Sequence, residues 1–269
     1  MESRKKQFDK IVSDIKKVKI QGARNVAKFA LHAYLLFPSE KSKNILLKSR
    51  PTEPMMENVL NMARKHSEKE ILKHFDDTQK KINEHVFKLI KNGNVIFTHC
   101  HSTNVLNALI YARKKGKKFE VYNTETRPLY QGRKTAQELG KAGIKVTIFA
   151  DSAFEIALLK YQDTKKVDLI LIGADALTKK GIINKIGSDA ISEIAYLHKI
   201  PVYIVADSWK YTSKKVPLEQ RNLNEIWNKA PKNVKIRNPS FAFVQKKYLK
   251  AIVSELGVLS YDKFLKKVD

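Results

Sequence analysis

Apolar residues recur at every third or fourth position through the first third of the chain, from Phe8 to about Ile90. This spacing places the apolar side chains on one face of a helix, so it predicts helices throughout this part. Two interruptions, at residues 37–39 and 47–54, contain prolines that end a helix or force an extended path. We therefore expect a small helical N-terminal domain over residues 1–90.

After residue 94 the pattern changes to short β-branched runs that alternate with helical segments. The expected strands cover residues 95–99, 119–125, 146–150, 167–173 and 201–206. A helix, or a loop and a helix, follows each of the first four, which is typical of a parallel sheet with crossover helices. The runs are almost continuously apolar, as strands covered on both faces are. The prediction is an α/β fold in which residues 91–269 form a Rossmann-like three-layer domain with a parallel sheet.

The composition describes a globular chain with enough apolar material for a core. The 269 residues are 43% hydrophobic and 29% charged, with only 10 Gly and 8 Pro. No uncharged apolar stretch reaches the roughly 18 residues of a membrane helix. No apolar run follows the charged first residues, so we expect no signal peptide and a cytoplasmic location. The single Cys excludes an internal disulfide and a Cys-based zinc site.

The chain is strongly basic, with 52 Lys and Arg against 27 Asp and Glu and a formal charge of +25. Such a charge attracts phosphates, whether they belong to a nucleic acid or to a small metabolite. The lysine pairs are scattered along the chain, so most of them are expected on a solvated surface. The sequence contains no nucleic-acid-binding motif, G-x-G-x-x-G fingerprint, P-loop or His cluster. A nucleic-acid partner, a dinucleotide and a metal are therefore disfavoured.

Polar side chains follow the predicted strands at their carboxyl ends, where open parallel sheets bind ligands. Cys100 lies between a strand and the start of a helix, where N–H groups and cations would lower the pKa of its thiol. A lone Cys is more often a small buried apolar residue, and Asp175 alone could equally be a turn residue. At the same edge of one sheet, the two form a candidate pair of thiolate base and carboxyl acid. His99 and His101 could orient this loop or transfer protons.

Candidate phosphate ligands are concentrated at the same edge. Arg offers bidentate contacts to phosphate oxygens and Lys a movable point charge, so two groups of them could hold two phosphoryl groups. Glycines at positions 181 and 187 bracket Asn184 and Lys185 and would allow a ligand to approach the backbone closely. The candidates are Arg127, Arg133, Lys185 and Lys210, joined by Arg24 and Arg50 from the helical part.

Seven short motifs, which together span most of the chain, resemble those of one superfamily. The motifs are Gln21-Gly-Ala-Arg24, Ser49-Arg-Pro-Thr52, Thr98-His-Cys-His-Ser102, Glu125-Thr-Arg-Pro128 with Gln131-Gly132, Gly173-Ala-Asp175, Asn184-Lys-Ile-Gly187 and Arg237-Asn-Pro-Ser-Phe241. The superfamily contains the isomerases of methylthioribose 1-phosphate and ribose 1,5-bisphosphate, and the alpha, beta and delta regulatory subunits of translation initiation factor 2B. The regulatory subunits generally lack the Cys and often replace the Asp, whereas both are present here. The Thr-His-Cys-His-Ser form resembles the archaeal ribose-1,5-bisphosphate isomerases more than the methylthioribose-phosphate enzymes, whose Cys usually follows an Arg.

The resemblance implies a role for each matching residue. Cys100 and Asp175 would be catalytic. The residues expected to contact substrate are Gln21, Gly22, Ala23, Arg24, Arg50, Asn184, Lys185 and Lys210, and Arg127 joins them as a phosphate ligand. Two positions depart from the family pattern, because Gln21 stands where Arg is common and Ala242 where Asp is usual.

The activity implied by the resemblance is the conversion of ribose 1,5-bisphosphate into ribulose 1,5-bisphosphate, on a route from AMP and nucleosides toward RuBisCO. Protonated Asp175 would donate to the ring oxygen and the Cys100 thiolate would take the C2 proton, through an enol phosphate. Burial raises the pKa of an Asp, whereas cations and a helix N-terminus lower that of a Cys, so one site could hold both forms. The expected partner is a phosphorylated pentose, with no metal or organic cofactor.

Other functions fit the same motifs. One is a non-catalytic regulatory subunit similar to those of initiation factor 2B, which binds a protein partner or a nucleotide or sugar-phosphate effector. Another is a methylthioribose-1-phosphate isomerase. Nucleic-acid binding, driven by the basic charge alone, ranks last. Members of this superfamily form dimers or trimers of dimers, so we expect a homodimer or homohexamer, and the sequence leaves a nucleotide activator open.

Overall fold

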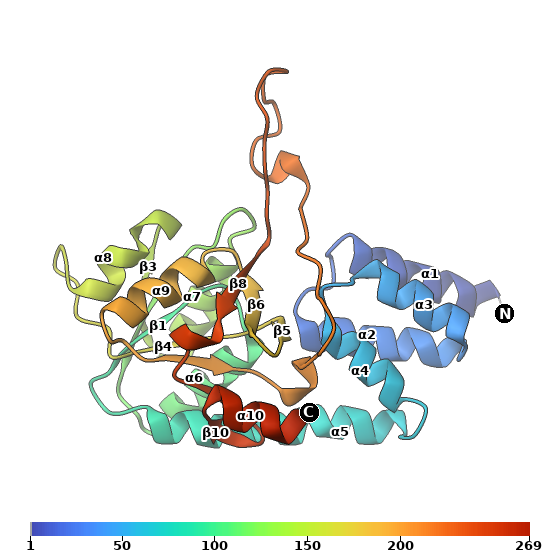
Figure 1. Ribbon diagram of the computed structural model, residues 1–269, viewed down its shortest axis with the longest axis horizontal. Helices are drawn as coiled ribbons and strands as arrows, with labels where there is room; N and C mark the ends of the chain where they lie inside the picture. The colour runs from blue at the N-terminus through green and yellow to red at the C-terminus, as the bar shows by residue number, and fades with distance from the viewer. Residues whose placement is uncertain (1) are drawn as a thin grey trace.

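The computed structural model describes residues 2–269, and its first part is helical (Figure 1). The helices are α1 (Glu2–Lys16), α2 (Ala23–Leu36), α3 (Glu40–Ser49), α4 (Pro54–Met62) and α5 (Glu68–Leu89). Ser39 caps α3 by accepting a hydrogen bond from the Ser42 N–H, and Pro54 is the first residue of α4. The two predicted interruptions therefore separate α2 from α3 and α3 from α4. Within residues 2–269, no helix combines the length and the apolarity needed to cross a membrane.

A seven-stranded sheet forms the second part, in the order β10-β9-β7-β4-β1-β2-β3. Its neighbouring strands are parallel except for β10, which is antiparallel to β9. The strands are β1 (Val95–Thr98), β2 (Glu120–Thr124), β3 (Lys145–Phe149), β4 (Leu169–Ile172), β7 (Val202–Val205), β9 (Ala251–Ser254) and β10 (Gly257–Leu259). The predicted α/β fold with a mostly parallel sheet is confirmed, and the five predicted strands are β1, β2, β3, β4 and β7. The pattern of the sequence did not indicate β9 and β10.

Helices cover both faces of this sheet, so the domain has three layers. One face packs against α5, α6 (Thr103–Lys114) and α7 (Gln131–Lys141), and the other against α8 (Phe154–Leu159), α9 (Ser188–Leu197) and α10 (Tyr261–Val268). Successive residues of one strand enter opposite cores: Ile96 belongs to the first and Phe97 to the second. The expectation of burial on both faces is wrong for β3, whose residues are half-buried or exposed because it is the edge strand.

A second, three-stranded antiparallel sheet was not predicted. It consists of β5 (Ala176–Leu177), β6 (Gly181–Lys185) and β8 (Phe241–Gln245), with β6 in the middle. The glycine at 181 does not open the backbone to a ligand, because a Cβ there would lie 2.0 Å from the Val244 carbonyl oxygen of the neighbouring strand. The segment that we expected to be a glycine-bracketed ligand loop is therefore mostly a strand. It carries Asn184 and Lys185 at its end.

Helix α5 contributes to the cores of both parts of the chain. Ile71 and Phe75 pack with residues of α2 and α4, whereas Ile82, Val86 and Ile90 pack with α6 and the large sheet. One continuous helix therefore joins the helical core to the core of the sheet. A domain boundary at residue 90 stays a prediction.

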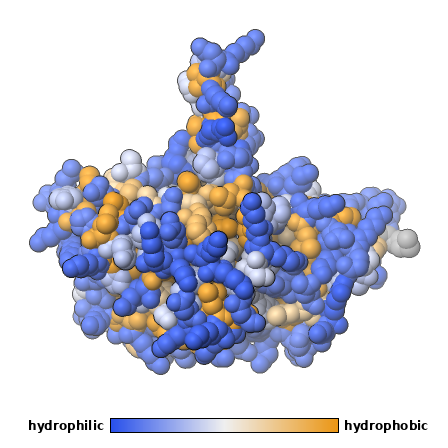
Figure 2. Space-filling model, viewed as in Figure 1, coloured by the Kyte–Doolittle hydropathy of each residue, from blue (hydrophilic) through white to orange (hydrophobic). Residues whose placement is uncertain are grey.

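Residues 213–240, which we call the arm, project away from the rest of the molecule between η2 (Ser208–Lys210) and β8 (Figure 1). Two backbone hydrogen bonds hold its base together, from the Arg221 N–H to the Asn238 carbonyl at 2.9 Å and from the Ser240 N–H to the Glu219 carbonyl at 3.1 Å. Apolar side chains lie exposed along it (Figure 2). They are Leu218, Leu223, Ile226, Trp227 and Val234.

Two glycines of α7 test the packing of this helix on β2. A Cβ on Gly132 would lie 1.8 Å from the Thr124 carbonyl oxygen, whereas one on Gly140 would meet no atom within 4 Å. We expect Gly132→Ala to lower the free energy of unfolding by about 2–4 kcal/mol, because the helix must move away from the strand. Gly140→Ala should raise it by about 0.5–1 kcal/mol, because alanine favours a helix. Urea unfolding measures both, and equal effects of the two changes would contradict this packing.

Candidate active site

The large sheet changes direction between β1 and β4. From β1 the chain builds outward through β2 to β3, and it then returns to place β4 and β7 on the other side of β1. In open α/β sheets such a switch point leaves a crevice at the carboxyl ends of the two strands, where ligands bind. Cys100 follows β1 and Asp175 follows β4, so both residues stand at this crevice.

Two adjoining cavities occupy the crevice. The larger has a volume of about 320 Å³ and the smaller about 50 Å³, and Cys100 and Asp175 line both of them. Helix α2 and the segment before it close the crevice from the helical part, through Gln21, Gly22 and Asn25. The site therefore lies between the two parts of the chain.

Most of the predicted substrate-binding residues line these cavities together with Cys100 and Asp175. Gln21, Gly22, Arg50 and Lys185 line the larger cavity, and Gly22, Ala23, Arg24, Asn184 and Lys210 line the smaller. Arg127 is not brought to either cavity. Its side chain is exposed and donates to the Tyr130 hydroxyl, while its backbone N–H binds Asp151. We therefore remove Arg127 from the predicted site.

Cys100 is held in a backbone conformation that is unusual for a residue with a side chain. Its φ is 67°, in the left-handed region, and its N–H donates to the Thr126 hydroxyl at 3.1 Å. Thr126 itself has a φ of 62°. Such conformations cost energy and persist where surrounding contacts enforce them, often at functional sites.

Two histidines fix the loop around Cys100 through their ring nitrogens. His99 is buried, with Nε2 donating to the Ile186 carbonyl at 2.9 Å and Nδ1 2.6 Å from the Thr124 hydroxyl. Since a carbonyl only accepts, the proton lies on Nε2, and burial lowers the pKa of His99 and keeps it neutral. His101 Nδ1 lies 3.0 Å from the Thr135 hydroxyl, which donates to the Cys100 carbonyl. Of the two roles left open for these residues, the contacts support orientation of the loop.

The environment of Cys100 does not favour a resting thiolate. Burial raises the pKa of the Cys100 thiol to about 11, although the charge of Lys185 opposes this and the charge of Asp175 adds to it. The expectation of a lowered pKa is therefore wrong for the ligand-free site. The cause is that the loss of water around the sulfur outweighs one nearby cation.

The pKa of Asp175 is shifted in the expected direction. Burial raises its pKa, and the cations Lys210, Lys185 and Arg50 oppose the rise without cancelling it. Lys210 Nζ donates to the Ala174 carbonyl at 2.6 Å, directly beside Asp175. The site therefore favours a protonated Asp175 more than water does.

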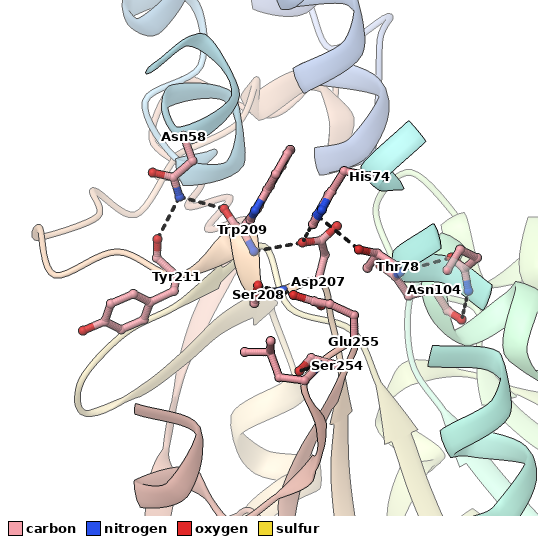
Figure 3. Close-up of polar contacts among 12 residues, drawn as sticks. Asn58, His74, Thr78, Asn104, Asp207, Ser208, Trp209, Tyr211, Ser254 and Glu255 are labelled. Carbon is pink, nitrogen blue, oxygen red and sulfur yellow. Dashed lines mark hydrogen bonds and ion pairs between the residues drawn. The ribbon is translucent and has the colours of Figure 1, made fainter. Parts of the chain in front are cut away.

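A polar network surrounds the start of η2, the short helix that ends at Lys210 (Figure 3). The Asp207 side chain accepts from the Trp209 N–H at 2.9 Å, and Glu255 accepts from the Ser208 N–H at 3.2 Å, so both stabilise the start of η2. The His74 ring of α5 stacks on the Trp209 ring at 3.4 Å, and its Nε2 lies 3.4 Å from the Asp207 carboxylate. Side chains of the helical part and of the sheet thus position Lys210 together.

His74, Asp207 and Glu255 also form the one group, among residues 2–269, whose donor atoms all lie within 4.8 Å and could share a metal ion. Their carboxylates already accept hydrogen bonds from η2. Hydrogen bonds within the chain therefore account for their arrangement, and we assign no metal to it. The absence of a metal and of an organic cofactor from the function stays a prediction.

Two residues that the sequence did not indicate, Glu53 and Arg221, also line the larger cavity. Glu53 follows Arg50 in the proline-rich interruption and lies 3.8 Å from its guanidinium. Glu219, at the base of the arm, lies 3.7 Å from the same guanidinium, and Arg221 pairs with Glu225. The only signal for Glu53 was a charged residue next to a motif, and nothing indicated that the arm would return to the site.

The two residues that depart from the family pattern, Gln21 and Ala242, lie in different parts of the structure. Gln21 lines the larger cavity beside Gly22. Ala242 lies buried in β8, opposite Asn184 of β6. Only Gln21 therefore stands where it could contact a ligand.

Comparison with known proteins finds one family throughout most of the chain. Residues 38–261 match the model of the initiation factor 2 subunit family. A ribose 1,5-bisphosphate isomerase of Archaeoglobus fulgidus is 30% identical over 91% of this chain and 87% of its own. One of Methanocaldococcus jannaschii is 33% identical over 91% and 89%. A crystal structure of the Pyrococcus horikoshii OT3 translation initiation factor eIF-2B superimposes with a TM-score of 0.81 at 26% identity, covering 94% of this chain and 96% of that one.

Alkylation of the single cysteine tests the environment of Cys100. Because only Cys100 can react, the rate of iodoacetamide labelling against pH reports its thiolate alone. We expect a midpoint near the shifted pKa of about 11, above the ordinary 9.0. Asp175→Asn should lower this midpoint, because the carboxylate charge that raises the Cys100 pKa is removed. A wild-type midpoint at or below 9.0 would contradict the assignment of a resting thiol.

Proposed function

The chain belongs to the initiation factor 2 subunit family and is a sugar-phosphate isomerase, and we propose that it converts ribose 1,5-bisphosphate into ribulose 1,5-bisphosphate. The observation that carries the proposal is that Cys100 and Asp175 line two adjoining cavities, each of which is also lined by cations. Arg50 and Arg221 line the larger cavity, whereas Arg24 and Lys210 line the smaller. A pentose that carries a phosphate at each end matches this distribution of charge, because each phosphoryl group would meet its own cations.

Asp175 begins the reaction as an acid. Its proton passes to the ring oxygen, the bond from C1 to that oxygen breaks, and the bonding electrons stay on the oxygen as it becomes a hydroxyl. The positive charge that develops at C1 is shared with the phosphate ester oxygen. Asp175 is then a carboxylate, which the cations Lys210, Lys185 and Arg50 stabilise.

Cys100 then carries the hydrogen between the two carbons. Its thiolate takes the C2 proton, and the electrons of that bond form the double bond of an enol phosphate. The Asp175 carboxylate takes the proton of the C2 hydroxyl, a ketone forms at C2, and C1 receives the proton from Cys100. Both groups return to their starting states, so no proton is gained or lost in one turnover.

The raised pKa of Cys100 sets a condition on this scheme. Cys100 and Asp175 share one proton in the resting site. With the proton on Cys100 the pair is a thiol and a carboxylate, and with the proton on Asp175 it is a thiolate and a carboxylic acid. The reactive form is therefore reached by an internal transfer, with no exchange with solvent. Activity should therefore fall at high pH, when Cys100 and Asp175 together lose this proton, near the Cys100 pKa of about 11.

A regulatory protein that binds a phosphorylated effector without turnover is the second candidate. One observation favours it, namely that burial keeps Cys100 protonated at neutral pH. A third candidate is a methylthioribose-1-phosphate isomerase, which would fill only one set of cations with phosphate. Turnover of defined sugar phosphates separates these three candidate functions.

We also infer that the chain works as a homodimer or homohexamer. The exposed apolar side chains of the arm, among them Leu223, Ile226 and Trp227, support this inference, because a second copy would remove them from water. A nucleotide activator stays open.

Turnover of defined sugar phosphates tests the proposed function. Purified protein is given ribose 1,5-bisphosphate, methylthioribose 1-phosphate or ribose 5-phosphate, and ketose formation is followed. We expect turnover of ribose 1,5-bisphosphate, and a loss of at least about 1,000-fold in kcat for Cys100→Ser, because the serine hydroxyl is a far weaker base than a thiolate.

Binding of ribose 1,5-bisphosphate to Cys100→Ser, measured by calorimetry, should stay within about threefold of the wild-type KM, because the phosphate ligands are unchanged. Full activity of this variant would contradict the mechanism. Tight binding without any turnover by the wild-type protein would favour the regulatory candidate.

A further inference from the structure

Arg50 and Glu53, which line the larger cavity, carry buried polar atoms without partners. Arg50 is 8% exposed and Glu53 3% exposed. Within the described chain, neither Nε nor Nη1 of Arg50 has a hydrogen-bond acceptor, and Oε2 of Glu53 has no partner. Leaving such groups unsatisfied costs about 1–3 kcal/mol each. Both residues line the cavity that holds Cys100 and Asp175, so after a small rotation of each side chain these atoms would meet a ligand bound there.

Glu53 is surrounded by charges from three parts of the chain. Arg50 comes from its own segment, Glu219 from the arm, and Asp175 and Lys210 from the carboxyl edge of the sheet. No direct hydrogen bond joins Glu53 to Arg50, since the distance of 3.8 Å is too long for one. The two side chains are therefore neighbours that leave their polar atoms free for a third group.

These surroundings keep the Glu53 carboxyl protonated at neutral pH. Burial and the charge of Asp175 raise the pKa of Glu53 to about 8, although Arg50 and Lys210 oppose the rise. A protonated carboxyl donates one hydrogen bond, whereas a carboxylate only accepts. At pH 7 the cavity therefore presents an O–H donor beside the N–H donors of Arg50.

We propose that Glu53 is a ligand-binding residue of this site and donates a hydrogen bond, as a carboxylic acid, to the phosphoryl group that Arg50 binds. The inference rests on the proposed function for the identity of the substrate, but it requires only a phosphoryl group or another tetrahedral oxyanion. Such an anion accepts hydrogen bonds and donates none when fully ionised. One such anion therefore accepts from the Glu53 hydroxyl and from the guanidinium of Arg50.

A sugar hydroxyl fits these atoms less well. A hydroxyl could donate to a Glu53 carboxylate, but it would leave the Arg50 guanidinium without an anionic acceptor. An ionised Glu53 would also repel a phosphate held 3–4 Å away by Arg50, so the proton on Glu53 is needed for the anion to bind. Binding should then weaken as pH rises through the pKa of Glu53.

The experiment measures the binding of inorganic sulfate to the intact protein by calorimetry between pH 7 and pH 9, where sulfate itself does not titrate. In the wild-type protein we expect the Kd to rise about tenfold over this range, because Glu53 loses the proton with which it donates. Glu53→Gln keeps a donor and cannot ionise, so its Kd at pH 7 should be within about threefold of wild type and change little up to pH 9. Glu53→Ala should bind about 10-fold more weakly than wild type at pH 7 and approach it at pH 9.

Glu57→Gln is the matched control. Glu57 lies one turn further along in α4, pairs with Lys214, and does not line the cavity that holds Cys100 and Asp175. This variant should keep the wild-type Kd and its rise with pH. A wild-type Kd that is constant from pH 7 to pH 9, or a rise that persists in Glu53→Gln, would overturn the proposal.

The kcat/KM for ribose 1,5-bisphosphate is measured in parallel to separate the two proposals. If the sulfate results hold but no ketose forms, the substrate is wrong and Glu53 still binds an oxyanion. If ketose forms but Glu53→Gln leaves the pH dependence of sulfate binding unchanged, the function stands and the role of Glu53 is wrong.

Discussion

Charged side chains are buried together at the carboxyl edge of the sheet, and they can be buried only because they compensate one another. Arg50, Lys185 and Lys210 are each less than a tenth exposed, and they surround the carboxyls of Asp175 and Glu53. A buried charge without a partner costs several kcal/mol, so removal of any one of them affects all the others. The same desolvation explains why the pKa values of Cys100, Asp175 and Glu53 are all raised. The resting site therefore favours the protonated forms of these groups, which suits a reaction that consists of proton transfers.

The fold brings these groups together from distant parts of the sequence. Cys100 and Asp175 come from neighbouring strands at the switch point of the sheet, whereas Arg50 and Glu53 come from a break between two N-terminal helices. Helix α5 links the two parts, because its first half packs in the helical core and its second half against the sheet. The His74 ring of α5 stacks on Trp209, which directly precedes Lys210 in η2. Precise placement of the charges therefore depends on packing far from the cavity.

The sequence predicted those features that depend on local pattern or on neighbouring strands. Periodic apolar residues located the helices and five of the seven strands of the large sheet, and polar residues at strand ends pointed to Cys100, Asp175 and Lys210. It could not predict β6 as a strand, because that strand exists through pairing with β8 nearly sixty residues away. The pKa of Cys100 was predicted in the wrong direction, since the loss of water around its sulfur in the folded chain is not visible in the local sequence. Glu53 was missed for the same reason: only the folded chain shows that its carboxyl is buried and without a partner.

The account depends most directly on the substrate lying against the Cys100 sulfur, and protection of that sulfur from alkylation measures this. Ribose 1,5-bisphosphate should slow iodoacetamide labelling of the single cysteine, with half-protection at a concentration equal to its KM. Unphosphorylated ribose at the same concentration should protect little, because it lacks the groups that the buried cations bind. Unchanged labelling at concentrations of ribose 1,5-bisphosphate that saturate turnover would show that the reaction occurs elsewhere, and it would contradict the placement of the active site between Cys100 and Asp175.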